Sequence, residues 1–190
     1  MLDRRSLLRT AFMRMAVLPA GAALSTSLGG CGFHPLYARA QSGGPGIATR
    51  ELQAISVDII PDRPGQLLRQ ALQDRFEGSG SGVARLYDLS VSYSIGGEGI
   101  AIQPDTSVTR IRLTGRADWF LHSQDPSRTL LAHGNARSLD AINILNEQFF
   151  AADLETEVVQ RRIADAIADQ ITAQIASFFV RRANQTASAS

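Results

Sequence analysis

The sequence of 190 residues contains no lysine, a single cysteine and three histidines. All 19 basic residues are therefore arginines, a bias that the base composition of a genome explains most simply. The single cysteine excludes an internal disulfide. With 44% hydrophobic and 19% charged residues, the composition fits one soluble domain and excludes a polytopic membrane protein.

Patterns typical of enzymes are also missing. His34, His122 and His133 lack the spacing of metal ligands, and no H-E-x-x-H or paired-cysteine motif occurs. The glycines in Gly96–Gly99 follow a predicted strand but open no helix, so they predict a turn and not a phosphate-binding loop. No nucleophile-elbow sequence supports a Ser-His-Asp triad. We therefore predict that the protein is not an enzyme and holds no metal.

The first thirty residues have the pattern of an export signal. Met1–Arg14 carries four arginines, and Met15–Leu28 is nearly free of charge. The apolar stretch is shorter than the ~20 residues that cross a bilayer comfortably. We predict that residues 1–30 are a signal peptide that is removed. Their removal leaves 15 arginines against 17 acidic residues, a balance that does not indicate a nucleic-acid-binding protein.

The export route is left open by the same segment. Asp3–Arg9 reads Asp-Arg-Arg-Ser-Leu-Leu-Arg and resembles the twin-arginine pattern, which serves proteins exported in a folded state. Adjacent arginines also occur in ordinary signal peptides that use the Sec route. Both routes remain possible readings of this segment.

The cysteine stands where a lipid anchor is expected. Leu28-Gly29-Gly30-Cys31-Gly32 resembles the lipobox of bacterial lipoproteins, with small residues next to the bond that is cut. We predict that Cys31 carries a covalent diacylglycerol and an N-acyl chain, which together anchor a protein stably, and that no other cofactor is bound. Gly32 is not the aspartate typical of inner-membrane retention, so we expect the outer membrane.

The mature chain divides into three parts. Residues 31–50 are predicted to form the lipidated cysteine and a flexible tether, because Ala40–Thr49 is rich in glycine, serine and proline. Residues 51–182 are predicted to form a single domain. The small polar residues 183–190 are predicted to form a disordered tail.

Apolar periodicity predicts the elements of this domain. Period-2 patterns indicate strands and apolar residues three or four apart indicate amphipathic helices. The expected elements are a strand over Leu52–Ile60, a helix from about Asp62 to Gly78, strands over Tyr87–Ile95, Thr106–His122 and Thr129–Leu139, and a long helix over Phe149–Arg182. The order β-α-β-β-β-α predicts an α+β fold, with a mixed or antiparallel sheet of about four strands and two helices packed on one face.

One predicted strand carries a row of arginines. Arg110, Arg112 and Arg116 alternate with apolar residues, which places them on the polar face of the strand at a period of ~6–7 Å. Such a row is a candidate anion-binding surface. The alternative is a solvated face balanced by Asp118 and nearby acidic residues.

Two segments resemble a known family. Cys31-Gly32-Phe33-His34-Pro35-Leu36-Tyr37 is similar to the start of the mature alphaproteobacterial LPS-assembly lipoprotein, LptE. Ala136–Leu145, Phe149–Ala151 and the long helix from Asp153 resemble its C-terminal half. The order of elements agrees over essentially the whole mature chain.

This resemblance implies a binding role without catalysis. Members of the family plug and help to assemble LptD, the outer-membrane β-barrel that transports lipopolysaccharide, and they can bind lipopolysaccharide. Arg110, Arg112 and Arg116 are then candidate contacts to lipopolysaccharide or to the barrel lumen, because guanidinium groups pair well with phosphates. This assignment is not carried over from a family motif. The alternative function is a free-standing, periplasm-facing lipoprotein that binds a glycan or a lipid.

Overall fold

The computed structural model describes residues 44–77, 82–102, 108–143 and 149–189. Cys31, the predicted signal peptide and most of the predicted tether lie outside the described residues. The elements are α2 (Ile47–Gln53), β1 (Ile55–Val57), α3 (Asp62–Glu77), β2 (Tyr87–Ile102), β3 (Val108–Ser123), β4 (Leu130–Asn143) and α4 (Phe149–Ala189).

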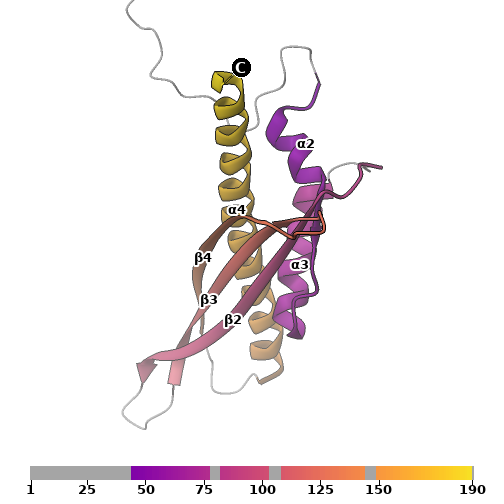
Figure 1. Cartoon of the computed structure of the whole chain (residues 1–190). Coiled ribbons are helices and arrows are strands. Elements are labelled where there is room, and N and C mark those ends of the chain that lie inside the picture. Colours follow the sequence, from indigo (N-terminus) through magenta and orange to yellow (C-terminus); the bar gives the residue numbers. More distant parts are fainter. Residues whose placement is uncertain (1–43, 78–81, 103–107, 144–148, 190) are drawn as a thin grey trace, which may run out of the picture. The chain divides into compact units, whose positions relative to one another are not determined.

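The four strands form one sheet in the order β1-β2-β3-β4, and the long strands β2, β3 and β4 lie side by side in Figure 1. β1 runs parallel to β2, because α3 connects them, and the other neighbouring strands are antiparallel. The predicted α+β fold with a mixed sheet is confirmed. The structure adds the short helix α2, which the sequence prediction had divided between the tether and the first strand.

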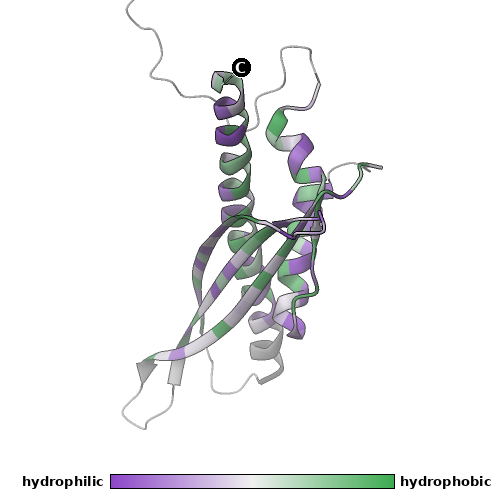
Figure 2. Cartoon of the chain, viewed as in Figure 1, coloured by the Kyte–Doolittle hydropathy of each residue, from purple (hydrophilic) through white to green (hydrophobic). Residues whose placement is uncertain are grey.

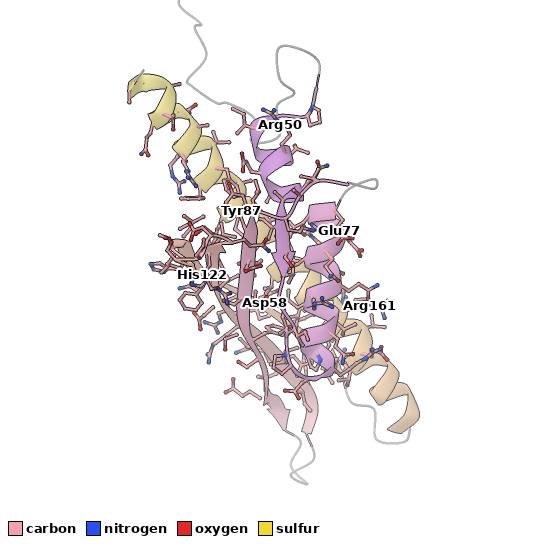
Figure 3. The ribbon with its side chains drawn as sticks, turned by 45° about the vertical axis from the view of Figure 1, so that its right-hand side comes forward. Arg50, Asp58, Glu77, Tyr87, His122 and Arg161 are labelled. Carbon is pink, nitrogen blue, oxygen red and sulfur yellow. The ribbon has the colours of Figure 1, made fainter. Side chains whose placement is uncertain are left out.

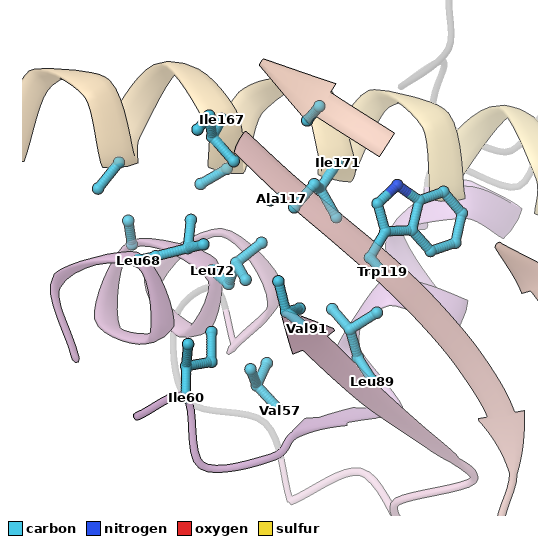
Figure 4. Packing of buried hydrophobic residues seen from close by; sticks show 14 of the residues in the cluster. Val57, Ile60, Leu68, Leu72, Leu89, Val91, Ala117, Trp119, Ile167 and Ile171 are labelled. Carbon is cyan, nitrogen blue, oxygen red and sulfur yellow. The ribbon is translucent and has the colours of Figure 1, made fainter. Parts of the chain in front are cut away.

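The core lies between one face of the sheet and the helices (Figure 4). Inward side chains of β2 and β3, such as Leu89, Ala117 and Trp119, are at most 2% exposed. They meet a stripe on α4 whose members include Ile167 and Ile171, both fully buried. The long strands show the alternation of apolar and polar residues in Figure 2, as expected for a sheet covered on one face.

One glycine and one arginine determine how the two long helices pack against the sheet and against each other. A Cβ atom at Gly115 of β3 would lie 2.5 Å from Cγ2 of Ile163, so only glycine lets α4 pack this closely against the strand. Arg75 of α3 joins the two long helices through ion pairs with Asp169 at 2.7 Å and Asp165 at 3.4 Å. The hydrogen bond to Asp169 is the main reason that the pKa of Arg75 is raised.

The predicted break at Gly96–Gly99 was wrong. β2 continues through the glycines to Ile102, and Glu98 pairs with Arg112 of β3. The register shifts only at Gly99, Ala101 and Ile102, where the ladder is irregular. Glycine weakens a strand by conformational entropy, but a long partner strand supplies hydrogen bonds that local sequence cannot reveal.

The first predicted strand was too long. Leu52 belongs to α2, and the ladder with β2 covers only Ile55–Val57. A period of two would place Ile59 on the same buried face as Ile55 and Val57, but Ile59 is 84% exposed and Ile60 is 1% exposed. The chain leaves the sheet after Val57 to enter α3, so the period of two ends there.

The predicted disordered tail was also wrong for the described residues. α4 continues from Arg182 to Ala189, and the segment 183–189 is helical. The hydroxyl of Thr186 donates to the carbonyl of Arg182, and that of Ser188 donates to the carbonyl of Asn184. Alanine-rich sequence without glycine or proline contains no stop signal, and these hydroxyls bond within the helix.

Candidate binding surface

The sheet face that points away from the helices is polar, and we call it the open face. Its side chains come from alternate positions of β2, β3 and β4, opposite the core positions on the same strands. It consists of Asp88, Ser90, Ser92, Ser94, Glu98, Arg110, Arg112, Thr114, Arg116, Asp118, Phe120, His122, His133, Asn135, Arg137 and Leu139. Figure 3 shows His122 on the strand side of the domain and Arg161 on the helix side.

The three predicted arginines lie together on the open face. Arg110, Arg112 and Arg116 are exposed at alternating positions of β3, so the predicted row exists. Their roles remain a prediction, and their surroundings differ. Arg112 approaches Glu98 at 4.0 Å, a weak contact because both side chains are about half exposed or more.

A fourth arginine joins this row from β4. Arg137 is the register partner of Arg116 and is likewise exposed. Arg137 could not be joined to this row from the sequence, because a residue's neighbour across a sheet depends on strand register. The period of two within Leu130–Asn143 could show which face of the sheet Arg137 lies on, but not which residue of β3 lies opposite it.

A shallow hollow lies beside Arg116 on the same face. It has a volume of about 410 Å³, and the residues around it include Ser94, Gly96, Glu98, Thr114 and Arg116. A Cβ atom at Gly96 would meet no atom within 4 Å, so the missing side chain leaves this part of the face open. Hydroxyl, carboxylate and guanidinium groups therefore surround a space suited to a polar ligand.

Comparison with protein families decides the relationship of the chain. Residues 52–175 match the family described as "LptE: Lipopolysaccharide-assembly". The chain belongs to the LptE family. It therefore has a role in lipopolysaccharide assembly, in a family of non-enzymatic proteins that work with the lipopolysaccharide-transport machinery. Comparison with curated proteins gives no significant match.

Several solved structures share the fold of this LptE-family chain, and two of them are compared with it. A protein of Caulobacter crescentus described as a "putative lipoprotein" is 22% identical, with a TM-score of 0.57, covering 71% of this chain and 98% of that one. The rare lipoprotein B of Shewanella oneidensis is 15% identical, with a TM-score of 0.50, covering 67% of this chain and 95% of that one. At such identities the similarity concerns the fold alone.

Glutamines of α4 close the outer edge of β4 in this LptE-family domain. The backbone N–H of Arg137 donates to Gln170 Oε1 at 3.3 Å, and Gln170 Nε2 donates to the Arg137 carbonyl at 3.0 Å. Gln174 Nε2 donates to the Asn135 carbonyl at 2.9 Å, and Gln174 Oε1 accepts the indole N–H of Trp119 at 2.9 Å. Strand addition at this stretch of the edge is therefore blocked, because its backbone groups are already bonded.

Two open clefts lie beside α4. One, of about 510 Å³, is formed with α2 and is lined by Ile47, Glu51, Tyr87, Phe179 and Arg182 among others. Tyr87 donates to Glu51 there at 2.7 Å, and burial with this bond raises the pKa of Tyr87 to about 12. The other cleft, of about 550 Å³, lies against the beginning of β4.

Two kinds of feature are missing from the described ranges. No group of three or more His, Cys, Asp or Glu side chains there could hold a metal ion. Among the helices described, none combines the length and apolar character needed to cross a membrane.

Proposed function

We propose that the chain is an outer-membrane lipoprotein, anchored through Cys31, that plugs the LptD barrel and assists its assembly. The observation that carries this proposal is the polar open face, which no helix covers in the described part of the chain. The lumen of an outer-membrane barrel is polar, so a face of serines, arginines and amides suits it. Membership of the LptE family supports the same partner.

The open face is large enough for such docking. Its three strands have 16, 16 and 14 residues. At ~3.3 Å per residue and ~4.8 Å of width per strand, they cover roughly 700 Å² before side-chain relief is counted. This approaches the ~800 Å² that each partner contributes to a standard protein interface.

Recovery of the barrel tests the docking proposal. The tagged full chain, purified from detergent-solubilised outer membranes, should bring down the LptD barrel in near-stoichiometric amount. Ser92→Trp on the open face should reduce this recovery, and Ala173→Trp at an exposed position of α4 should not. Absence of any barrel would favour a free-standing lipoprotein, and equal loss in both variants would reject the open face as the docking surface.

The predicted lipid anchor at Cys31 agrees with the proposed location and has its own test. Two of the solved structures with this fold are described as a "putative lipoprotein" and as "rare lipoprotein B", and Cys31 stands in a lipobox-like sequence. Mass spectrometry of the native protein should find residues 1–30 removed and the predicted diacylglycerol and N-acyl chain at Cys31. An unmodified thiol with the first thirty residues still attached would reject the anchor.

The arginine row is proposed to contact lipopolysaccharide or the barrel lumen. Replacing Arg110, Arg112 and Arg116 with glutamine should weaken lipopolysaccharide binding by the full chain and reduce its dependence on salt, because charge-assisted bonds are lost. Unchanged binding would leave these side chains as a solvated face.

A further inference from the structure

Arg116 and Arg137 place two like charges directly opposite each other on neighbouring strands. They are register partners on β3 and β4. The N–H and C=O of Arg137 bond to Gln170 of α4, so they point away from β3. The two residues therefore form a pair without mutual backbone hydrogen bonds. In such pairs of an antiparallel sheet the Cα atoms are ~4.5 Å apart, and the side chains are closer together than in hydrogen-bonded pairs. Both side chains leave the sheet on the open face.

No acidic side chain neutralises this pair within the ranges that the structure describes. Among those residues, no carboxylate forms an ion pair with either guanidinium, in contrast to Arg112, which contacts Glu98. Asp118 is the nearest acidic residue along β3, one step away on the same face, where its register partners are Ser92 and Asn135. Like charges placed directly opposite each other destabilise a sheet. An anion between them would remove that repulsion.

We propose that Arg116 and Arg137 clamp one phosphate group of a phosphorylated glycolipid headgroup, and that the adjoining sugar occupies the hollow over Gly96. This inference rests on the proposed function and names a ligand contact within it. Two guanidinium forks can hold a phosphate by paired, charge-assisted bonds. Ser94 and Thr114 bring hydroxyls to the hollow, and Glu98 brings a carboxylate that can accept bonds from sugar hydroxyls.

Binding to matched lipids tests the clamp. The full chain in neutral detergent is titrated with phosphorylated lipid A, with the same lipid after enzymatic removal of its phosphates, and with glucosamine phosphate. Arg116→Gln/Arg137→Gln should bind phosphorylated lipid A at least ~10-fold more weakly, because the charge-assisted bonds to the phosphate are lost. Its binding of the dephosphorylated lipid should equal that of the wild type.

A control variant removes the same charge elsewhere. Arg63→Gln/Arg161→Gln replaces two arginines that are each 63% exposed and that both approach Glu157, on the helix side of the domain. It should bind phosphorylated lipid A within about twofold of the wild type. Equal weakening in both double variants would show an effect of net charge and overturn the clamp. Binding of glucosamine phosphate that depends on the pair would support a site for the headgroup alone, and dependence only with the lipid would support a clamp that also needs the acyl chains of the lipid.

Stability without ligand gives an independent readout. Arg137→Gln should raise the Tm of the full chain at low salt, and this rise should shrink at high salt, where the repulsion is screened. Phosphorylated lipid should raise the Tm of the wild type more than that of the variant. A lower or unchanged Tm in Arg137→Gln would remove the premise that the two cations oppose each other.

The outcomes separate the clamp from the docking proposal. If the Arg116→Gln/Arg137→Gln variant loses the phosphate contribution and still recovers the barrel, the clamp stands as a site distinct from docking. If the wild type recovers the barrel and the variant binds phosphorylated lipid normally, the clamp fails and the docking proposal stands. If the phosphate contribution depends on the pair but no barrel is recovered, the clamp stands alone.

Discussion

Alternate residues of one strand have opposite surroundings on the two faces of the sheet. On the covered face, Ala117 and Trp119 are at most 2% exposed and belong to the core that α4 completes. On the open face, Arg116 and Asp118 are exposed, and Phe120 is 41% exposed. The covered face thus carries most of the stability through apolar burial. The open face can carry charges and unpaired polar groups, so function can be placed there with little loss of stability.

Two adjacent aromatic residues on opposite faces should show the largest difference in stability when each is replaced by alanine. Trp119→Ala should lower the free energy of unfolding by about 3–5 kcal/mol, because it leaves a cavity beneath α4. Phe120→Ala should lower it by about 1 kcal/mol or less, since its main aromatic contact is the stacked ring of His133 at 6.3 Å. Urea unfolding of the full chain measures both. Equal losses would contradict the division into a structural and a functional face.

Two glycine substitutions should have different effects on the free energy of unfolding. Gly115→Ala places a methyl group 2.5 Å from Ile163 and should destabilise the domain by about 1–3 kcal/mol. Gly96→Ala on the open face meets no atom within 4 Å and should be neutral or stabilising by up to about 1 kcal/mol, because it restricts the unfolded chain. Thermal unfolding distinguishes them, and destabilisation by Gly96→Ala would show that the open face is tightly packed.

The edge of β4 lies between the covered face and the open face, and substitutions beside it test whether the glutamines of α4 stabilise it. Gln174→Leu removes the acceptor of the Trp119 indole N–H and the donor to Asn135, and should destabilise by about 1–2 kcal/mol. Ala173→Leu, at the exposed neighbouring position, should stay within about 0.5 kcal/mol of the wild type. Chemical denaturation checks the difference, and a stable Gln174→Leu variant would mean that the edge needs no cover from α4.

The two tyrosines on the covered face should have the smallest effect on stability, and it should be visible only at high pH. Burial raises the pKa of Tyr93 to about 12, and burial with the bond to Glu51 raises that of Tyr87 to about 12. An unfolded tyrosine titrates near ~10, so their contribution to stability is full below pH ~10 and is lost as the pH rises toward 12.

Phenylalanine variants test this titration. Tyr87→Phe/Tyr93→Phe should show a shallower loss of stability over that alkaline range. At neutral pH, Tyr93→Phe alone should not destabilise, because its buried hydroxyl has no hydrogen-bond partner among the described residues. Tyrosinate absorbance against pH locates the two pKa values, and titration of both groups near ~10 would contradict their burial.

Much of the fold was predictable because its signals are local. The alternation of Leu89 and Val91 with serines predicted the strand and its buried face, and the spacing of Ile163, Ile167 and Ile171 predicted the helix and its stripe. The prediction failed at boundaries. Within α4, Val158 keeps the four-residue spacing from Leu154, but Val159 is buried and Val158 is 56% exposed, and two adjacent valines do not show by themselves which one lies on the stripe.

The candidate site was predicted in part for the same reason. The row of Arg110, Arg112 and Arg116 follows from the period of a single strand. The pairing of Arg116 with Arg137 depends on how β4 is placed against β3, and that placement is fixed by long-range hydrogen bonds and by Gln170 of α4. The hollow over Gly96 required β2 to continue through glycines that locally favour a turn.

The amino-acid sequence by itself determined which residues of each strand or helix share a face, since backbone geometry repeats every two or 3.6 residues. It also carried the family resemblance and the lipobox-like segment around Cys31. Only the tertiary structure decided which strands are neighbours, which face the helices cover and which arginines meet across β3 and β4. Those choices depend on apolar burial and backbone pairing between segments far apart in the chain, and no local pattern records them.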